Sequence, residues 1–259
     1  MIDNGSTDDS AEKLKPYGDK VEVVSDATRH AQEALYTKHF KTKIVKYEWT
    51  VVCDLDEFIY SRRGVPTVRY FLDHLDPRVS QVAVSWKLFG SNGYNTPDQK
   101  EPSSVIDSFT KRANYDKDAR LHGASGPQLH GVDRVERGMN MNHVKCIFRS
   151  RRLVSFGIHS HAVRPDVTLA ACARRAVTSG GVAPCNESIL AHHYLHLNHY
   201  AIRSLEWFMR VKATRGAADV AASENVRNET YYRRFDTNSN DIEDVELKNK
   251  RKSTATLGR

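Results

Sequence analysis

The sequence predicts an α/β fold in which a mixed, mainly parallel sheet is flanked by helices. Candidate strands and helices alternate over the first ninety residues, which is the pattern that βαβ units produce. The chain has 259 residues, of which 39% are hydrophobic and 27% are charged, as is typical of globular proteins. It is therefore long enough to form one large domain with a substantial core.

Local patterns place the expected helices and strands along the chain. Helices are expected where apolar residues recur at helical spacing or a capping residue precedes them, at 11–17, 27–46, 66–75 and 201–215. Strands are expected at the β-rich runs 21–24, 49–53, 81–88, 144–149 and 153–158. Because 49–53 is a continuous β-rich run, it predicts a strand covered on both faces. The polar, glycine-containing segments 91–103 and 114–140 predict long surface loops.

The pattern divides the chain into three expected parts. A main domain at 1–216 ends at Gly216, which can terminate the last clearly amphipathic helix. A helical extension at 217–247 follows, and the lysine-rich segment 248–259 is expected to be a disordered basic tail. No apolar run approaches the roughly 20 residues that a transmembrane helix requires, and residues 1–5 do not resemble the apolar region of a signal peptide.

The charge of the chain favours an anionic partner. Lysine and arginine number 39 against 32 aspartate and glutamate residues, so the formal net charge is +7. Such a balance suits a phosphorylated small molecule, a membrane surface or a nucleic acid. No RNA-recognition, zinc-finger or helix-turn-helix pattern is present, so a nucleic-acid partner is not expected.

Two aspartates follow the apolar run at 49–53, which is expected to form the second strand. Asp54 and Asp56 are separated by one residue, so strand geometry would direct both carboxylates to the same side. Two like charges at close range repel each other and favour a bound cation. Hard oxygen ligands suit Mg²⁺ or Mn²⁺, and ligands in open α/β sheets bind beyond the carboxyl ends of strands. A solvated aspartate pair that opens a loop is the structural alternative.

The first residues form a second polar motif. The turn Asp3-Asn4-Gly5-Ser6-Thr7-Asp8 precedes a predicted helix. Backbone N–H groups and Asp or Asn side chains at such a turn can hold the ribose or base of a nucleotide. Taken alone, the motif fits a simple helix cap equally well, with Ser6 or Thr7 as the capping residue.

Taken together, the two motifs resemble those of a known family. The Asp-Asn-Gly-Ser-Thr-Asp turn, followed after about fifty residues by Asp-Leu-Asp-Glu-Phe, is similar to nucleotide-diphospho-sugar glycosyltransferases of the type A fold, which is Rossmann-like. The resemblance is closest to the family-2-like group and the related family 92 proteins. It covers roughly residues 2–216, and its further matching segments are 86–93, 144–149, 157–161, 192–194 and 204–216.

The resemblance implies the donor and the metal site. A nucleotide-diphospho-sugar would be the donor, and Mn²⁺ or Mg²⁺ would be the cofactor. Residues implied to bind the metal are Asp54, Asp56, His161 and His159, with His193 as the next histidine to consider. Residues implied to contact the nucleotide are Asp3, Asn4, Asp54 and Lys145, with Lys212 and Arg215 as further basic groups for the phosphates.

The resemblance also implies the reaction. A sugar would pass to the hydroxyl of a carbohydrate, a lipid-linked glycan or a protein-linked glycan, with inversion of the anomeric centre. Inversion requires a carboxylate base, for which Asp133 and Glu136 are the candidates. Members of this fold usually have a strand and a helix before the aspartate-asparagine turn. Since the turn here begins at residue 3, an N-terminally truncated domain is expected.

Two alternative functions remain open at this point. In haloacid dehalogenase-like phosphatases an apolar strand also ends in Asp-x-Asp, but a threonine or valine usually stands where this chain has Phe58. That motif also normally lies near the start of the chain. A non-catalytic nucleic-acid-binding domain would account for the charge of +7 but lacks a supporting motif.

Overall fold

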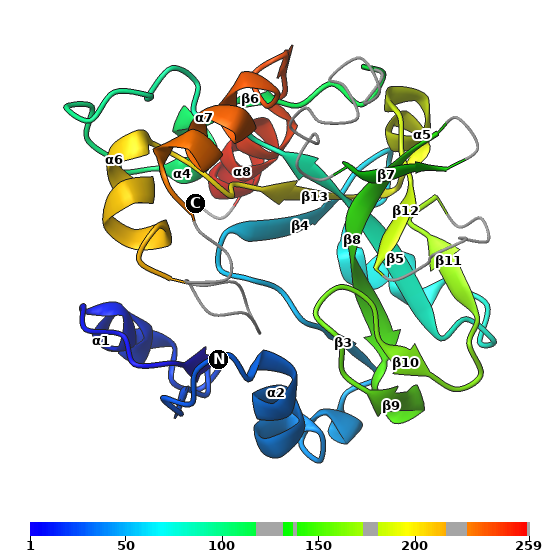
Figure 1. Ribbon diagram of the computed structural model, residues 1–259. Helices are drawn as coiled ribbons and strands as arrows, with labels where there is room; N and C mark the ends of the chain where they lie inside the picture. Colours follow the sequence, from blue (N-terminus) through cyan, green and yellow to red (C-terminus); the bar gives the residue numbers. More distant parts are fainter. Residues whose placement is uncertain (118–131, 137–138, 173–180, 216–226, 258–259) are drawn as a thin grey trace.

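A mixed sheet of eight strands occupies the centre of the computed structural model, and helices lie around it (Figure 1). The structure describes residues 1–117, 132–136, 139–172, 181–215 and 227–257, without the side chains of 132–136, 139–141 and 254–257. Within these ranges, no helix has both the length and the apolar character needed to span a membrane.

The pairing of the strands confirms a mixed sheet but not a mainly parallel one. The central path is β12 (Val182–Pro184), β8 (Met139–Arg149), β5 (Gln81–Leu88), β13 (Leu195–His199) and β4 (Glu57–Ser61). Beside it, β3 (Trp49–Val51) and β7 (Val132–Glu136) pair with β8, and β11 (Thr168–Ala170) pairs with β5. Among the described pairings of this sheet, β11 and β13 run parallel to β5, and the other five pairings are antiparallel. From β7 to β12 the described strands follow one another without an α-helix, and most of them therefore pair antiparallel.

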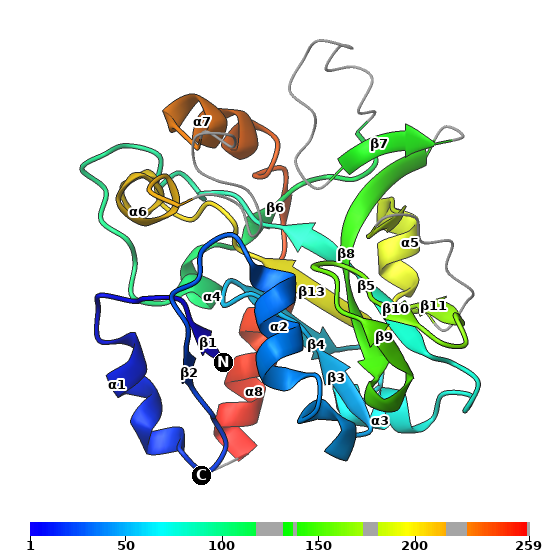
Figure 2. The ribbon, with the colours of Figure 1, turned by 60° about the horizontal axis from the view of Figure 1, so that its bottom comes forward.

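The N-terminal part forms a small parallel unit of its own. Its elements are β1 (Ile2–Asp3), α1 (Ser10–Leu14), the 3₁₀ turn η1 (Lys15–Tyr17) and β2 (Val24–Ser25). Figure 2 shows this unit beside α2 (Gln32–Phe40). The helix expected at 11–17 is confirmed. The one expected at 27–46 is shorter, because His30 has a φ of +53° and the helix begins only after it; the 3₁₀ turn η2 (Ile44–Lys46) follows separately.

Most of the strands expected from the sequence are present, with changed partners or burial. β5 spans the expected 81–88, and the expected 144–149 lies within β8. β9 (Leu153–Ser155) follows the 3₁₀ turn η4 (Ser150–Arg152) and pairs with β10 (Ala162–Val163) rather than with β8. The expectation that β3 is covered on both faces is wrong, because β3 pairs only with β8 among the described strands and Val51 is 40% exposed.

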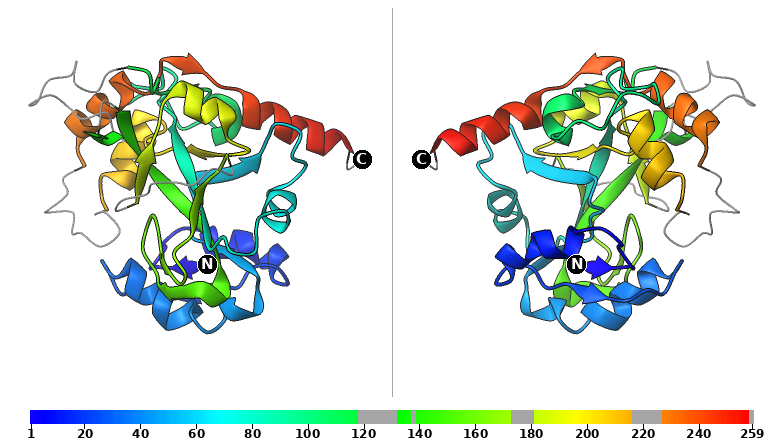
Figure 3. Two further views of the ribbon diagram at one scale, coloured as in Figure 1. Left: turned by 90° about the vertical axis from the view of Figure 1, so that its right-hand side faces the viewer. Right: turned by 90° about the vertical axis from the view of Figure 1, so that its left-hand side faces the viewer.

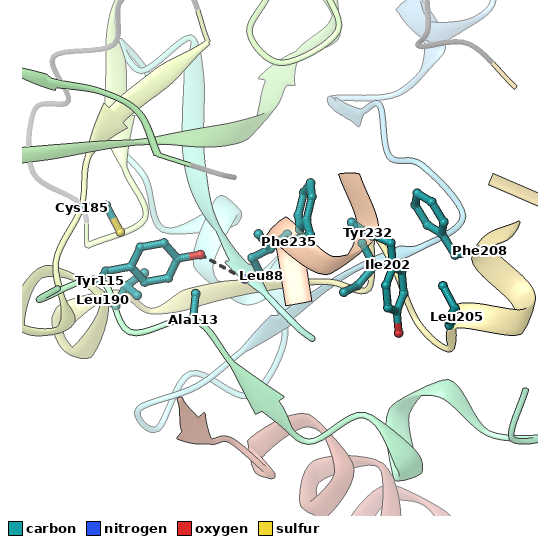
Figure 4. Packing of buried hydrophobic residues seen from close by; sticks show 11 residues of the cluster. Leu88, Ala113, Tyr115, Cys185, Leu190, Ile202, Leu205, Phe208, Tyr232 and Phe235 are labelled. Carbon is teal, nitrogen blue, oxygen red and sulfur yellow. Dashed lines mark hydrogen bonds between the residues drawn. The ribbon is translucent and has the colours of Figure 1, made fainter. Parts of the chain in front are cut away.

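A buried apolar cluster joins the C-terminal part of the chain to β5 and α5 (Glu187–His192) (Figure 4). α6 (Leu205–Trp207) begins after Ser204, whose hydroxyl accepts a hydrogen bond from Trp207 N, and continues as the π-helical η5 (Phe208–Lys212). α7 (Glu229–Thr237) packs Tyr232 and Phe235 into the same cluster. The cluster consists of Leu88, Ala113, Tyr115, Cys185, Leu190, Ala201, Ile202, Leu205, Phe208, Tyr232 and Phe235. The described part of the expected extension therefore shares a core with the main domain.

The segment after β5 serves as a docking point for the end of α7. A Cβ atom added at Gly90 would lie 2.5 Å from Ser239 O, so only glycine allows this close approach. Ser91 N donates to Asp236 Oδ1 at 2.8 Å, and Asn92 N donates to Asn240 Oδ1 at 2.9 Å. This conformation of 90–93 is therefore tied to residues 236–240.

A buried lysine holds the C-terminal helix. Lys87 Nζ lies 2.7 Å from Asp244 Oδ2 and also donates to Tyr60 Oη at 2.7 Å. Arg112 Nε lies 2.9 Å from the same Asp244 oxygen. Arg112 belongs to β6 (Lys111–Arg112), which pairs with β14 (Ile242–Glu243), and Asp244 directly follows β14. The expected disorder of the basic tail is wrong at least for α8 (Glu246–Leu257), which extends away from the body of the molecule (Figure 3). Lys248 of α8 donates to Asp107 O, at 2.8 Å, in α4 (Val105–Ser108).

A second helix–sheet core surrounds β5 from another side. α3 (Val68–Asp73) lies within the expected 66–75, is capped by the Thr67 hydroxyl, and contributes Phe71 and Leu72 to this core.

In a separate cluster His161 packs against Phe148, with ring centroids 4.3 Å apart, and accepts a hydrogen bond from Gly157 N at 3.2 Å. Burial, with a smaller contribution from Lys145, lowers the pKa of His161 to about 4.

We expect Asp244→Ala to destabilise the fold by about 3–5 kcal/mol, because it leaves the buried ammonium of Lys87 and the guanidinium of Arg112 without a shared counter-ion. Urea unfolding followed by circular dichroism measures this. Asp241→Ala is the control, since Asp241 pairs with the more exposed Lys117 and should cost less than about 1 kcal/mol. Equal costs for the two variants would show that the Lys87 network does not hold the C-terminal segment.

We expect His161 to make stability fall between pH 6.5 and 4. The unfolded chain binds a proton near pH 6.5 but the folded chain only near pH 4, so the stabilisation is complete above pH 6.5 and is lost as the pH falls. At pH 5 the loss would be roughly 2 kcal/mol. Urea unfolding at pH 7.5 and 5.0 should show a smaller difference for His161→Gln than for the unchanged protein, whereas exposed His74→Gln should leave the difference intact.

Candidate active site

One face of the large sheet gathers charged and aromatic side chains from four strands. Glu57 in β4 lies opposite His199 in β13. In the pairing of β13 with β5, Trp86 lies opposite the residue two positions before His199. In the pairing of β5 with β8, Lys145 lies opposite the residue two positions before Trp86. Side chains two residues apart in a strand share a face. All four side chains therefore lie on the same face of the sheet.

Asp54 and Asp56 lie in the short loop that joins β3 to β4. Glu57 N donates to Asp54 O at 3.1 Å, and Asp54 N donates in return to Glu57 Oε2 at 3.0 Å. Tyr200 N donates to Asp56 O at 2.9 Å and ties the loop to the end of β13. Asp56 is buried, while Leu55 between the two aspartates is exposed. These hydrogen bonds therefore fix the backbone positions of Asp54 and Asp56.

Lys145 is the central cation of this face. Its Nζ lies 3.1 Å from Asp54 Oδ2 and 3.5 Å from Glu57 Oε2, and it donates to Ile158 O at 3.0 Å. The side chain is fully buried. Burial opposes its charge, but the carboxylates of Glu57 and Asp54 outweigh burial and raise the pKa of Lys145. The sequence-predicted pair Asp54 and Lys145 is thus brought into direct contact.

Asp56 is held by two groups from the C-terminal half of the chain. Lys212 Nζ, at the end of η5, donates to Asp56 Oδ2 at 2.8 Å. His199 Nε2 lies 3.5 Å from Asp56 Oδ1. Burial opposes ionisation, but His199 and Lys212 hold the pKa of Asp56 well below its usual range. Asp56 is therefore an anion at neutral pH.

Glu57 is the least satisfied group of the site. Its side chain is fully buried, and its Oε1 atom has no hydrogen-bond partner among the described residues. Burial raises the pKa of Glu57, and the nearby His199 and Lys145 counteract this only in part. Trp86 Nε1 and His199 Nδ1 are also buried without a partner in the described part of the chain. Such unsatisfied atoms are costly and are a feature of functional sites.

The charges of the site can accept a further cation. With Asp54, Asp56 and Glu57 ionised and His199 neutral, the three carboxylates exceed the two ammonium groups of Lys145 and Lys212 by one charge. No three His, Cys, Asp or Glu side chains in the described ranges form a ready metal centre. The donor chemistry nevertheless fits Mg²⁺ or Mn²⁺, since such ions are bound by one or two carboxylates together with substrate phosphates.

The N-terminal turn is tied to the same region through α2. Asn4 Nδ2 donates to Asp26 O at 2.7 Å and to Thr28 O, while Asp3 Oδ1 accepts from Ser6 N at 2.9 Å. Further along, Gln32 at the start of α2 donates to Asp54 Oδ1 at 3.4 Å. The described contacts thus place Asn4 in a supporting position for the turn and leave the Asp3 side chain at its surface.

The histidines chosen from the sequence lie apart from the aspartate contacts. The His159 ring packs against those of Trp86 and His143, at 5.2 and 4.6 Å, and its Nδ1 lies 3.2 Å from Val144 O. Burial lowers its pKa to about 4. His161 lies in the apolar core beside Phe148. Neither histidine, nor His193, is among the described contacts of Asp54 and Asp56.

His199 and Lys212 complete the contacts of Asp56, and sequence reasoning did not single out His199. A signal was available, because the run Leu-His-Leu-Asn-His has the alternation of a half-polar strand. Which histidine faces the aspartates depends on strand register, and a single sequence does not reveal it.

Asp133 and Glu136 lie in β7, but their side chains are outside the described residues.

Comparison with known proteins supplies the family. A model of glycosyltransferase family 92 matches residues 10–239, which include every residue of the face described above. A search of curated proteins found no match. The phosphatase and nucleic-acid-binding alternatives receive no support from this match. The chain belongs to glycosyltransferase family 92, and it is therefore a glycosyltransferase, which uses a sugar donor and a glycoconjugate acceptor.

Proposed function

We propose that this chain transfers a sugar from a nucleotide diphosphate to an acceptor hydroxyl, with Mn²⁺ or Mg²⁺ bound at Asp54 and Asp56. The observation that carries the proposal is the pair of aspartates in the β3–β4 loop, each engaged by a lysine, at 3.1 Å for Lys145 and 2.8 Å for Lys212. Membership of family 92 supports sugar transfer in general. The two aspartates would bind the metal ion that holds a diphosphate, and the neighbouring lysines would add positive charge to the site.

The proposed metal ligands are the carboxylates of Asp54 and Asp56. When bound, the ion would neutralise the negative charge that develops on the departing diphosphate. His199 is the proposed nitrogen ligand in place of His159 and His161, because its Nε2 lies 3.5 Å from Asp56 Oδ1. Phosphate oxygens and water would fill the remaining positions, as is usual for Mg²⁺ sites.

Lys212 and Lys145 have different proposed roles. Lys212 is partly exposed and sits at the end of a short helix, so it can leave Asp56 and contact a donor phosphate when the metal binds. Lys145 is fully buried and contacts Asp54 and Glu57 together. It orients the Asp54 carboxylate, and it reaches a phosphate only through that carboxylate.

The nucleoside is proposed to bind at the N-terminal turn, in a fold of the glycosyltransferase type A. Asp3 lies at the surface of the turn and would accept hydrogen bonds from the nucleoside. Asn4 would act by holding the turn against residues 26–28. The parallel β1–α1–β2 unit supports this assignment, because a strand–turn–helix connection presents backbone N–H groups to a nucleotide.

The acceptor side of the reaction depends on a base. Asp133 and Glu136 of β7 remain the proposed candidates, and their strand pairs with β8, the strand that carries Lys145. Transfer with inversion requires one of them to take the proton of the acceptor hydroxyl. A carbohydrate, a lipid-linked glycan or a protein-linked glycan is the proposed acceptor.

We expect Asp56→Asn to abolish metal-dependent donor binding, because it removes one carboxylate of the proposed ion site. Isothermal titration of UDP- and GDP-sugars, with and without MnCl₂, should show affinity reduced by about 100-fold or more for the variant. Asp73→Asn is the matched control, since Asp73 lies on the exposed face of α3 and pairs with Arg69. The proposed site would be wrong if Asp56→Asn and Asp73→Asn bound the donor with equal strength and if neither needed metal to do so.

We expect Lys212→Ala to weaken donor binding about tenfold, since it removes one charged phosphate contact from a partly exposed position. Arg210→Ala is the control on the same helix, because Arg210 pairs with Glu206 at the surface. Its donor affinity should stay within about twofold of the original. A similar loss in both variants would mean that general positive charge, rather than Lys212, attracts the donor.

A further inference from the structure

A basic hollow of about 360 Å³ lies at the opposite end of β3 from the aspartates. Its lining consists of Val45, Lys46, Tyr47, Glu48, Arg149, Arg151 and Arg152. Trp49, the first residue of β3, pairs with Arg149 at the end of β8, whereas the chain reaches Asp54 only after the other end of β3. The hollow is therefore separate from the proposed donor site, and no step described above uses it.

The cations of the hollow differ in how far they are engaged. Arg152 donates to the backbone oxygens of Pro77 and Arg78, at 2.7 and 2.8 Å. Arg149 stacks over the Trp49 ring at 4.3 Å and pairs with Glu48. These two arginines line the hollow, and the contacts just described hold their side chains in place.

Lys46 and Arg151 are the cations that remain available. Arg151 uses only its Nε, which donates to Val45 O at 3.3 Å, and its terminal nitrogens have no partner in the part of the chain that the structure describes. Lys46 lies over the Tyr47 ring at 5.1 Å, and no described carboxylate is within ion-pair distance of it. Both side chains are exposed. They can therefore bind an anion without breaking an existing ion pair.

Exposed apolar side chains adjoin these two cations. Val45 is 46% exposed and Tyr47 is 56% exposed, and Val154 in β9 is 43% exposed. Ile44, directly before Val45, is buried in the cluster of Phe148 and Phe156. Because Ile44 anchors the segment, Val45 and Tyr47 are held outwards by the fold.

We propose that this surface, Lys41–Tyr47 with Arg151 and Val154, docks on an anionic phospholipid membrane, with a lipid phosphate in the hollow. Basic side chains near an anionic bilayer each strengthen attachment, and tyrosine favours the boundary between headgroups and acyl chains. Lys41 extends the basic rim next to Val154, whereas Lys43 lies over the Phe40 ring and is paired with Glu22. A free phosphate would use only the cations and would leave the outward Val45 and Tyr47 without a role.

The test is co-sedimentation of the full chain with vesicles of phosphatidylcholine alone or with 30 mol% phosphatidylserine. We expect binding to the anionic vesicles only. The double variant Lys46→Glu/Arg151→Glu should bind them at least about 30-fold more weakly. Val45→Ser/Tyr47→Ser should lose about fivefold, because it removes the apolar contribution. Circular dichroism confirms that each variant is folded.

The matched control is Arg69→Glu/Arg233→Glu, which changes the net charge equally at exposed helix positions. Its binding should stay within about threefold of the original. An equal loss in this control would overturn the proposal, since the total charge of +7 would then account for the attraction. Loss of binding on adding 10 mM inorganic phosphate, with no effect of Val45→Ser/Tyr47→Ser, would overturn it in favour of a phosphate site. Donor titration of Lys46→Glu/Arg151→Glu should be unchanged, which separates this surface from the proposed active site.

Discussion

The contact of the buried Lys145 ammonium with Asp54 and Glu57 is the interaction on which the site depends. An ammonium group removed from water is stable only when carboxylates replace its lost hydration. Lys145 reaches both carboxylates from β8, and Glu57 in turn fixes the Asp54 backbone. Lys145 therefore holds the Asp54 end of the loop. Asp56 is held by the hydrogen bond from Tyr200 N and by the contacts with Lys212 and His199.

Two buried lysines on opposite faces of the sheet show how a structural site differs from a functional one. Lys87 follows Trp86 in β5, so its side chain points away from the Lys145 face. It is fully enclosed by Asp244, Tyr60, His196 and Glu246 and serves to hold the C-terminal segment. On the Lys145 face, by contrast, Glu57 Oε1 stays unpaired and Asp54 is partly exposed. Of these two lysine sites, as far as the structure describes them, the one around Lys145 retains an unpaired buried carboxylate oxygen, and the proposed metal and diphosphate would bind there.

The sequence predicted local features well and tertiary partners poorly. The strand at 81–88 follows from a run of a few residues, and the structure contains it. Asp54 and Asp56 lie in a loop beyond the end of β3, and each contacts a different lysine. The strands β4 and β13 were missed because they are short and are stabilised by pairing with each other and with β5. His199 was missed for the same reason, since its place opposite Glu57 exists only in the folded sheet. The sequence predicts a disordered tail where α8 forms, because the charge of this segment is visible in the sequence, whereas the contacts of α8 with Asp107 and Lys87 are not.

The family match extends to residue 239, well beyond Lys212, the last residue of the proposed site. The packing of α7 gives a physical reason. Phe208, at the start of the η5 turn that carries Lys212, is fully buried against Tyr232 of α7, with ring centroids 5.2 Å apart. π-helical turns such as η5 are costly and recur at functional sites, so this one requires support from its surroundings. α7 supplies that support, and the segment after it holds 90–93 at the end of β5. In the described part of the chain, α7 therefore supports the turn that places Lys212 against Asp56.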